Sequence, residues 1–222
     1  MNATPPALRA AAFVRVEGLL LPGHLLRSAL YLGANAPGIG GRAAALGSLL
    51  AATPALAAFS LTDRRRLRRL AGYGLRGLTR DRIDALSREY YERFLAGELR
   101  DEGQAALERA RAAGLRLVLF SRGLGRALAP LAEELGADLL VASEPEYRDE
   151  VATGRLLEPA PDWARELAER ERIPLGASYA YGHDLADEAL LEAVGFPCAV
   201  APDPALRRAA RAAGWPVLEL RA

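Results

Sequence analysis

Four short polar segments carry the side chains best suited to chemistry, and each of them follows an apolar stretch. They are residues 15–18, residues 121–123, residues 182–187 and the residues around Glu158. Arg15 and Ser121 together could bind a phosphate or a carboxylate, because a bidentate guanidinium and a hydroxyl both suit such an anion. Arg15 could instead form an ion pair with Glu17 or Asp187, which would fill the site and have a purely structural role. Glu17 could also carry a proton in an acid–base step.

Apolar runs of strand length alternate with helical patterns of about ten residues along most of the chain. We expect strands at residues 10–16, 115–120, 138–142, 177–181, 197–200 and 217–220, and a β-hairpin over residues 146–157 that turns near Thr153 and Gly154. We expect helices at residues 101–113, 124–135, 162–172, 184–194 and 204–213. This alternation predicts βαβ units around a buried parallel sheet. Because ligands of open α/β sheets bind beyond the carboxyl ends of the strands, the four polar segments should meet at one edge.

The chain between the first and second expected strands is mainly helical and is too long for a single crossover. One of its helices should follow Thr62 and Asp63, which suit an N-cap, and another should start at Thr79. An inserted helical cap explains such a block best. We therefore assign residues 1–21 and 100–222 to an α/β core and residues 22–99 to the cap.

The strand ends together resemble the haloacid dehalogenase superfamily, and specifically its phosphoserine-phosphatase-like subfamily IB. The resemblance is clearest in residues 74–86, 112–121 and 179–220. It implies a Rossmann-like core with a parallel sheet and an α-helical cap inserted between the first and second core strands. It also implies phosphomonoester hydrolysis, in which one aspartate attacks phosphorus, a second acts as acid and base, and Mg²⁺ and a lysine offset negative charge.

At the positions of this family's motifs, the sequence keeps some residues and replaces others. The first strand of the family ends in a DxDGT-type motif, where this chain has Arg15 at the nucleophile position and Glu17 at the acid–base position. Ser121 matches the hydroxyl residue that binds phosphoryl oxygens. In the magnesium-binding turn, His183 replaces the first acid and Asp187 matches the second. Asp184 could contribute only if that loop were shifted by one residue.

The family's lysine has no counterpart, because all 29 basic residues of this chain are arginine. The matching window, residues 158–163, contains no lysine. Arg155 or Arg165 could supply positive charge there, with a different reach and geometry. The nucleophile, one magnesium-binding acid and the lysine are thus replaced together, which predicts that the aspartyl-phosphate mechanism is absent.

We therefore expect a pseudophosphatase that acts by binding a protein partner or a phosphate or carboxylate ligand. The candidate ligand-binding residues are Arg15, Ser121, His183 and Asp184, and we expect no metal ion or other cofactor because the family's Mg²⁺ ligands are largely missing. The alternative is a phosphomonoester hydrolase with a non-standard mechanism. In that case Glu17 and Asp187 would be catalytic, or His183 would activate water together with Glu17 or Asp184.

The overall composition excludes several other classes of function. The 222 residues carry a formal net charge of +1, which argues against a nucleic-acid-binding protein. Without lysine, no step can use a lysine amine as a Schiff base or a phosphate clamp. The single cysteine, Cys198, excludes an intrachain disulfide and is expected to be a small buried hydrophobe. Residues 1–10 lack the pattern of a signal peptide, so we expect a cytoplasmic protein.

Two stretches of the expected cap could bind a partner. Residues 43–62 carry no charge, but they are rich in alanine and interrupted by Pro54, so a buried helical hairpin is favoured over a transmembrane segment. An interfacial helix and a protein-binding surface stay open as alternatives. A basic cluster follows, either a solvated face or a contact for an anionic partner, made of Arg64, Arg65, Arg66, Arg68 and Arg69. His24, near the junction of core and cap, is expected at the surface or as a capping residue.

Overall fold

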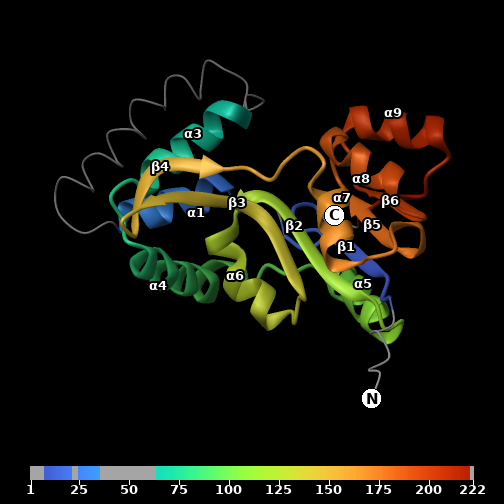
Figure 1. The fold of residues 1–222 in the computed structure, drawn as a ribbon, viewed down its shortest axis with the longest axis horizontal. Coiled ribbons are helices and arrows are strands. Elements are labelled where there is room, and N and C mark those ends of the chain that lie inside the picture. The colour runs from blue at the N-terminus through green and yellow to red at the C-terminus, as the bar shows by residue number, and fades with distance from the viewer. Residues whose placement is uncertain (1–7, 22–24, 36–63, 221–222) are drawn as a thin grey trace.

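The computed structural model describes residues 8–21, 25–35 and 64–220 (Figure 1). The predictions for His24 and for residues 43–62 therefore lie outside the described residues. Of the arginine cluster, only the side chain of Arg69 is described, and it is exposed. Within these ranges, no helix is both long enough and apolar enough to span a membrane.

The described strands form one seven-stranded sheet in the order β4-β3-β2-β1-β5-β6-β7. Six of them run parallel: β1 (Ala11–Arg15), β2 (Arg116–Leu124), β3 (Leu139–Arg148), β5 (Tyr179–Gly182), β6 (Phe196–Val200) and β7 (Val217–Leu218). The seventh, β4 (Val151–Leu157), pairs antiparallel with β3. Figure 1 shows the sheet crossing the molecule from β4 on the left to β6 on the right. The predicted α/β fold around a mainly parallel sheet is confirmed.

The sequence of β1 suits the centre of the sheet. All five of its residues are buried, and Phe13 pairs in register with Val118 of β2 on one side and Ala180 of β5 on the other. Successive side chains enter opposite layers, so that Val14 and Phe13 belong to two separate hydrophobic clusters. A strand buried on both faces has a continuous apolar run, which is why the sequence pattern predicted it.

Helices cover both faces of the sheet. On one face, α5 (Asp101–Ala112) and α6 (Gly125–Glu134) contribute Leu107 and Leu128 to the first cluster. On the other face, the second cluster receives Leu167, Leu191 and Leu206. These come from α7 (Trp163–Glu171), α8 (Glu188–Ala193) and α9 (Pro204–Ala213). Two covered faces leave the strand ends and their loops as the place where side chains can meet a ligand.

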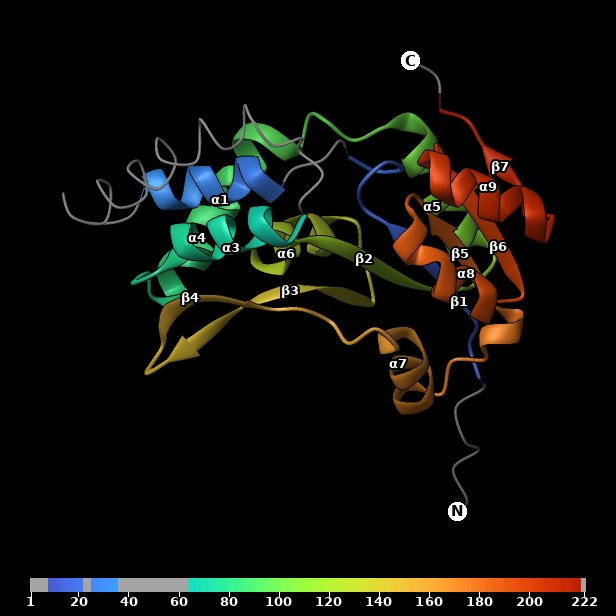
Figure 2. The same cartoon turned by 90° about the horizontal axis from the view of Figure 1, so that it is seen from above.

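Between β1 and β2 the chain forms a helical block. Its described elements are α1 (Leu25–Ala34), α3 (Arg64–Leu75), α4 (Arg80–Tyr90) and a π-helical turn, η1 (Tyr91–Leu95). Thr79 caps α4 as predicted, because its hydroxyl accepts the N–H of Arg82 at 3.3 Å. In Figures 1 and 2 these helices and the far ends of β3 and β4 form one lobe. The proposed domain boundaries, after residue 21 and before residue 100, stay a prediction.

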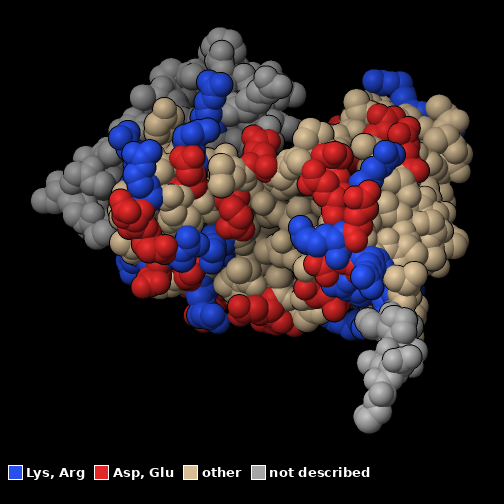
Figure 3. All heavy atoms as spheres, in the orientation of Figure 1, with Lys and Arg blue, Asp and Glu red and all other residues tan. Residues whose placement is uncertain are grey.

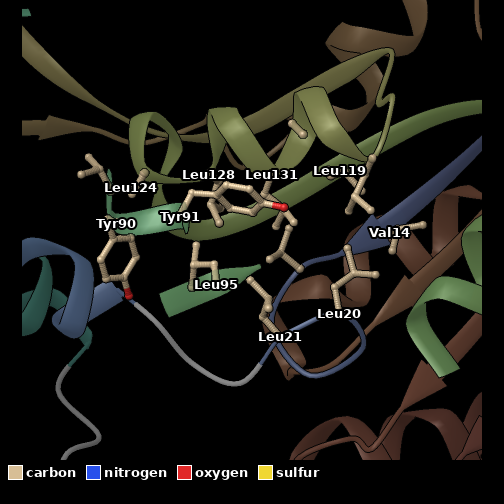
Figure 4. Packing of buried hydrophobic residues seen from close by; sticks show 14 of the residues in the cluster. Val14, Leu20, Leu21, Tyr90, Tyr91, Leu95, Leu119, Leu124, Leu128 and Leu131 are labelled. Atoms are coloured by element: carbon tan, nitrogen blue, oxygen red, sulfur yellow. The ribbon is translucent and has the colours of Figure 1, made fainter. Parts of the chain in front are cut away.

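A leucine-rich cluster anchors this helical block to the sheet (Figure 4). Leu20 and Leu21 follow β1, while Tyr91 and Leu95 belong to η1, and all four are buried in the same cluster as Leu128 of α6. Their burial fixes the turn that follows β1. That turn carries one of the polar segments predicted to form the site.

The β-hairpin turns earlier than predicted. β3 continues to Arg148, and the turn consists of Asp149 and Glu150, with φ angles of 49° and 63°, rather than Thr153 and Gly154. Two consecutive left-handed residues give a tight turn whose twist matches that of the strands. Two other boundaries differ from the prediction. β2 extends beyond residue 120 to residue 124, and a short 3₁₀ turn, η3 (Leu185–Asp187), precedes α8 where one continuous helix was expected.

Candidate functional site

Three neighbouring strands bring the predicted polar segments together. β1 lies between β2 and β5, so the carboxyl ends of these three strands are adjacent. Arg15 ends β1 and pairs in register with Phe120, which directly precedes Ser121. The loop after β5 carries residues 183–187. The geometry places the side chains at one edge of the sheet, where the sequence pattern expected them.

The guanidinium of Arg15 is the centre of this site. Its side chain is 4% exposed, and carboxylates face it from three residues. Nε donates to Oε2 of Glu17 at 2.6 Å, Nη1 donates to Oδ1 of Asp187 at 2.6 Å, and Nη2 lies 3.5 Å from Oδ2 of Asp184. The guanidinium also lies over the ring of Phe120, with Cζ 5.6 Å from the ring centroid. Arg15 is therefore engaged as the ion pair that the sequence allowed.

Both carboxylate oxygens of Glu17 accept hydrogen bonds. Oε2 faces Arg15, while Oε1 accepts from the hydroxyl of Ser121 at 2.6 Å and from the backbone N–H of Gly123 at 3.2 Å. The N–H of Gly123 also lies 2.8 Å from Oγ of Ser121. The hydroxyl that was expected to bind an external anion thus binds a carboxylate of the protein itself.

The loop after β5 is held in place by its own carboxylates. Oδ2 of Asp187 accepts the backbone N–H groups of His183, at 2.8 Å, and of Asp184, at 3.2 Å. Oδ1 of Asp184 accepts the N–H of Ala186 at 3.1 Å. Nη2 of Arg122 lies 3.6 Å from that same Oδ1 and brings a second cation to the site. Reciprocal capping of this kind fixes the direction of both aspartates.

His183 and Gly18 make a close contact beside the ion pairs. Nδ1 of His183 lies 3.0 Å from the carbonyl oxygen of Val200, so the tautomer with a proton on Nδ1 donates to β6. Gly18 has a φ of 91°, and a Cβ built on it would lie 2.5 Å from that Nδ1. The ring is thus engaged by the backbone of β6, and the backbone N–H of His183 by Asp187. A role of this side chain in ligand binding stays a prediction.

We expect Gly18→Ala to destabilise the protein. A Cβ in the left-handed region costs about 1 kcal/mol or more, and overpacking against the ring of His183 adds about 1–2 kcal/mol. Urea unfolding measures the loss. Gly77→Ala is the matched control, because Gly77 has a φ of 83° with nothing within 4 Å of the new Cβ. Equal losses in the two variants would contradict the close contact with His183.

Burial disfavours the charged forms of Arg15 and Asp187, and the attraction between opposite charges in the cluster favours them. Burial by itself would lower the pKa of Arg15, but Glu17, Asp187 and Asp184 raise that pKa above its ordinary value. Burial raises the pKa of Asp187, with Arg15 opposing the shift and Asp184 adding to it. Arg15 therefore keeps its charge at any working pH, and the carboxylates depend on it as their counter-ion.

The donor set does not fit the Mg²⁺ that the resemblance implies. Mg²⁺ needs several oxygen ligands around one point, but at this point the guanidinium of Arg15 takes the facing oxygens of Glu17 and Asp187. The ring of His183, at one of the family's ligand positions, is engaged with Val200. Among residues 8–21, 25–35 and 64–220, no group of three or more His, Cys, Asp and Glu side chains is arranged to hold a metal ion.

A cavity of about 460 Å³ opens beside the ion pairs. Arg15, Ser121 and Asp187 line it on the side of the cluster, and Phe120 and Trp163, with ring centroids 5.5 Å apart, form an aromatic wall. Its other lining residues are Arg122, Val141, Ser143, residues 158–161, Leu185, Ala186, Glu188 and Ala189. Figure 3 shows one face of the molecule, where charged side chains gather on both lobes and uncharged residues lie between them.

The extra cation at the site is not one of those expected in place of the lysine. Arg155 binds Glu146 at 3.2 Å on the hairpin, and Arg165 lines a separate surface groove. The charge comes instead from Arg122, which the sequence placed in a polar segment without indicating its direction. Sequence reasoning also missed Trp163 as a wall of the cavity. An aromatic residue at the start of a helix carries no signal of that kind.

Comparison with known proteins supports the resemblance to the haloacid dehalogenase superfamily. Residues 20–192 match the family model described as haloacid dehalogenase-like hydrolase. The inhibition of morphological differentiation protein of Streptomyces azureus is 38% identical over 125 residues, which are 54% of this chain and 45% of that protein. A phosphoserine phosphatase of Mycobacterium tuberculosis is 31% identical over 121 residues, 52% of this chain and 30% of that enzyme. The chain thus spans less than half the length of these curated relatives.

Solved structures give the fold over nearly the whole chain. A protein with unknown function from Bordetella pertussis superimposes with a TM-score of 0.75 at 23% identity, covering 96% of this chain and 99% of that one. A substrate-bound phosphoserine phosphatase superimposes with a TM-score of 0.64 at 15% identity, covering 96% and 94%. The family match over residues 20–192 shows that the chain belongs to the haloacid dehalogenase-like hydrolase family, and the solved structures share its fold.

Proposed function

We propose that this protein has the phosphatase fold without aspartyl-phosphate chemistry, and that it acts by binding. The position of Arg15 carries the proposal. A guanidinium has no lone pair with which to attack phosphorus. This one is buried, donates to two carboxylates and lies close to a third. No change of its rotamer could turn it into a nucleophile.

The residues around Arg15 support the same proposal. Ser121 and Gly123, which suit phosphoryl oxygens, donate to Glu17. The ring of His183 is engaged by Val200. The chain has no lysine to neutralise a phosphate. Each group that the family uses for phosphoryl transfer is therefore either replaced or bound to another part of the chain.

Two surfaces are candidates for binding. The cavity beside Arg15 has room for a small ligand with a phosphate or carboxylate group. The helical block between β1 and β2 is the candidate surface for a protein partner. Tyr73 and Phe94 on that block are 57% and 39% exposed, and aromatic residues are enriched at protein interfaces.

The proposal predicts that the protein has no Mg²⁺-dependent phosphatase activity. We expect hydrolysis of p-nitrophenyl phosphate at the level of a heat-denatured sample, with or without Mg²⁺, and no hydroxylamine-sensitive phosphoryl label on the chain. Glu17→Gln and Asp187→Asn should leave this background unchanged, and a phosphoserine phosphatase serves as the positive control. Strong Mg²⁺-dependent turnover that either substitution abolishes would refute the proposal.

A second candidate function is phosphomonoester hydrolysis by a non-standard route. The observation that favours it is the likeness to a relative named phosphoserine phosphatase. In this route Glu17 or Asp184 would act together with His183 to activate water. Turnover that needs no Mg²⁺ and is lost in His183→Ala would favour this candidate over the first.

A further inference from the structure

We infer that Arg15, Ser121 and Gly123 form a carboxylate-binding cradle whose occupant in the present conformation is the protein's own Glu17. One oxygen of Glu17 accepts from Nε of Arg15 at 2.6 Å. The other accepts from Oγ of Ser121 at 2.6 Å and from the N–H of Gly123 at 3.2 Å. The inference rests on the proposed binding function and specifies its ligand: the carboxylate group of a small molecule, bound in exchange for Glu17.

The cradle is a preformed binding site, because the side chains that donate in it are buried. Arg15 and Ser121 are 4% and 5% exposed. A buried charged or hydroxyl donor without an acceptor is costly. When Glu17 leaves, these donors need another acceptor, and a second carboxylate satisfies both the hydroxyl of Ser121 and the charge of Arg15.

The local charges select a singly charged ligand. Arg15 lies beside Glu17, Asp184 and Asp187, and Arg122 lies beside Asp184, so these five groups carry a net charge of −1. Exchange of Glu17 for another carboxylate keeps that charge. A phosphomonoester dianion would make it more negative beside two buried aspartates, which repel it. The donors also bind the two oxygens of Glu17 from opposite sides, an arrangement that suits the carboxylate of a ligand as well.

The neighbouring cavity supplies both access and a preference for the rest of the ligand. Arg15 and Ser121 line it, so a carboxylate that enters it reaches two of the three donors. Phe120 and Trp163 form its aromatic wall. Flat apolar groups pack well against such rings. The ligand class is therefore a small carboxylic acid with an apolar or aromatic body.

Removal of Glu17 should expose the cradle to added carboxylates. The chain has two tryptophans, Trp163 and Trp215, so Trp215→Phe leaves the fluorescence of Trp163 as the reporter. We expect phenylacetate, titrated without Mg²⁺, to bind Glu17→Ala about tenfold or more tightly than the protein with Glu17, because an intramolecular competitor acts at a high effective concentration. Acetate should bind more weakly than phenylacetate, and inorganic phosphate more weakly than both. Adding Ser121→Ala should reverse the gain.

Glu144→Ala is the matched control, because Glu144 pairs with Arg126 at 3.2 Å and does not line the cavity. An equal gain in this control, no gain in Glu17→Ala, or tightest binding of phosphate would each overturn the inference. If Glu17→Ala fails to fold, Glu17→Gln removes the same charge with a smaller change of shape; because its amide oxygen can still accept from Ser121 and Gly123, we expect a smaller gain in the same direction. Turnover in the phosphatase assay would refute the proposed function, whereas this titration tests the cradle without a reaction.

Discussion

Arg15→Ala is expected to lower the free energy of unfolding by about 3–5 kcal/mol at neutral pH, as removal of one partner of a buried ion pair does. The substitution leaves Glu17, Asp184 and Asp187 around a small apolar side chain. Two of these carboxylates lose a hydrogen bond of 2.6 Å at the same time. Urea unfolding at pH 7 measures the loss.

The size of this loss should depend on pH in a defined direction. Burial already raises the pKa of Asp187, and Arg15 opposes that shift, so the substitution raises the pKa further. A carboxyl whose folded-state pKa exceeds its unfolded value binds more protons when folded, and stability falls as pH rises through that window. The window starts near the ordinary aspartate value of about 4. The difference between wild type and Arg15→Ala should therefore shrink on acidification.

Two further variants separate the ion pair from packing. Arg15→Lys keeps the charge but loses the forked donor geometry, so we expect a loss smaller than that of Arg15→Ala. Arg116→Ala breaks a more exposed pair with Glu171, at 3.1 Å, and should shift the melting temperature far less. Hydrogen bonding to Arg116 lowers the pKa of Glu171, so the pH dependence of this smaller loss lies below the ordinary glutamate value. A stability of Arg15→Ala equal to that of wild type at pH 7 would contradict the central role of this ion pair.

The sheet could be predicted because burial on both faces removes the polar alternation of its central strands. Residues 11–14 and 117–120 are uninterrupted apolar runs, and glycines or polar residues mark their ends. The hairpin turn could not be predicted in this way. Left-handed φ angles at Asp149 and Glu150 are imposed by the pairing of β3 with β4 rather than by residue type. Glycine is the commonest such residue, so the pattern favoured Gly154, which also has a positive φ but lies within β4, where a Cβ built on it would lie 3.2 Å from Cβ of Arg76.

The sequence predicted which side chains of the site lie close together, but it did not predict their hydrogen-bond partners. Arg15, Ser121 and Asp187 follow strands that are neighbours in this topology, so their convergence follows from strand order. Whether Arg15 meets carboxylates or an open cavity depends on its rotamer, which burial and distant charges decide together. The direction of Arg122 and the cavity wall at Trp163 depend on the same packing. Sequence reasoning therefore left two interpretations of Arg15 open, and in the structure its guanidinium contacts the carboxylates of Glu17 and Asp187.

Arg15→Asp combined with His183→Asp is expected to turn the ion-pair cluster into a Mg²⁺ site. Arg15 and the four charged groups near it carry a net charge of −1, and the two substitutions make that charge more negative by three when His183 is counted as neutral. Crowded carboxylates repel one another until a cation joins them, and oxygen is the ligand that Mg²⁺ prefers. Mg²⁺ should therefore stabilise the double variant by about 2.7 kcal/mol at a concentration one hundred times its dissociation constant. The same concentration should leave the wild-type melting temperature unchanged.

The double variant separates the metal site from the reaction. We expect it to bind Mg²⁺ in calorimetric titration and still to hydrolyse no p-nitrophenyl phosphate, because the chain contains no lysine to neutralise the phosphoryl group. Each single substitution should bind Mg²⁺ more weakly, since Arg15 still holds the carboxylates in His183→Asp. A folded double variant without any Mg²⁺-dependent shift would mean that residues 15 and 183 do not correspond to the family's metal positions. Mg²⁺ binding together with turnover would mean that arginine can replace the lysine, and that the lack of activity we propose for this chain would depend on Arg15 and His183 alone.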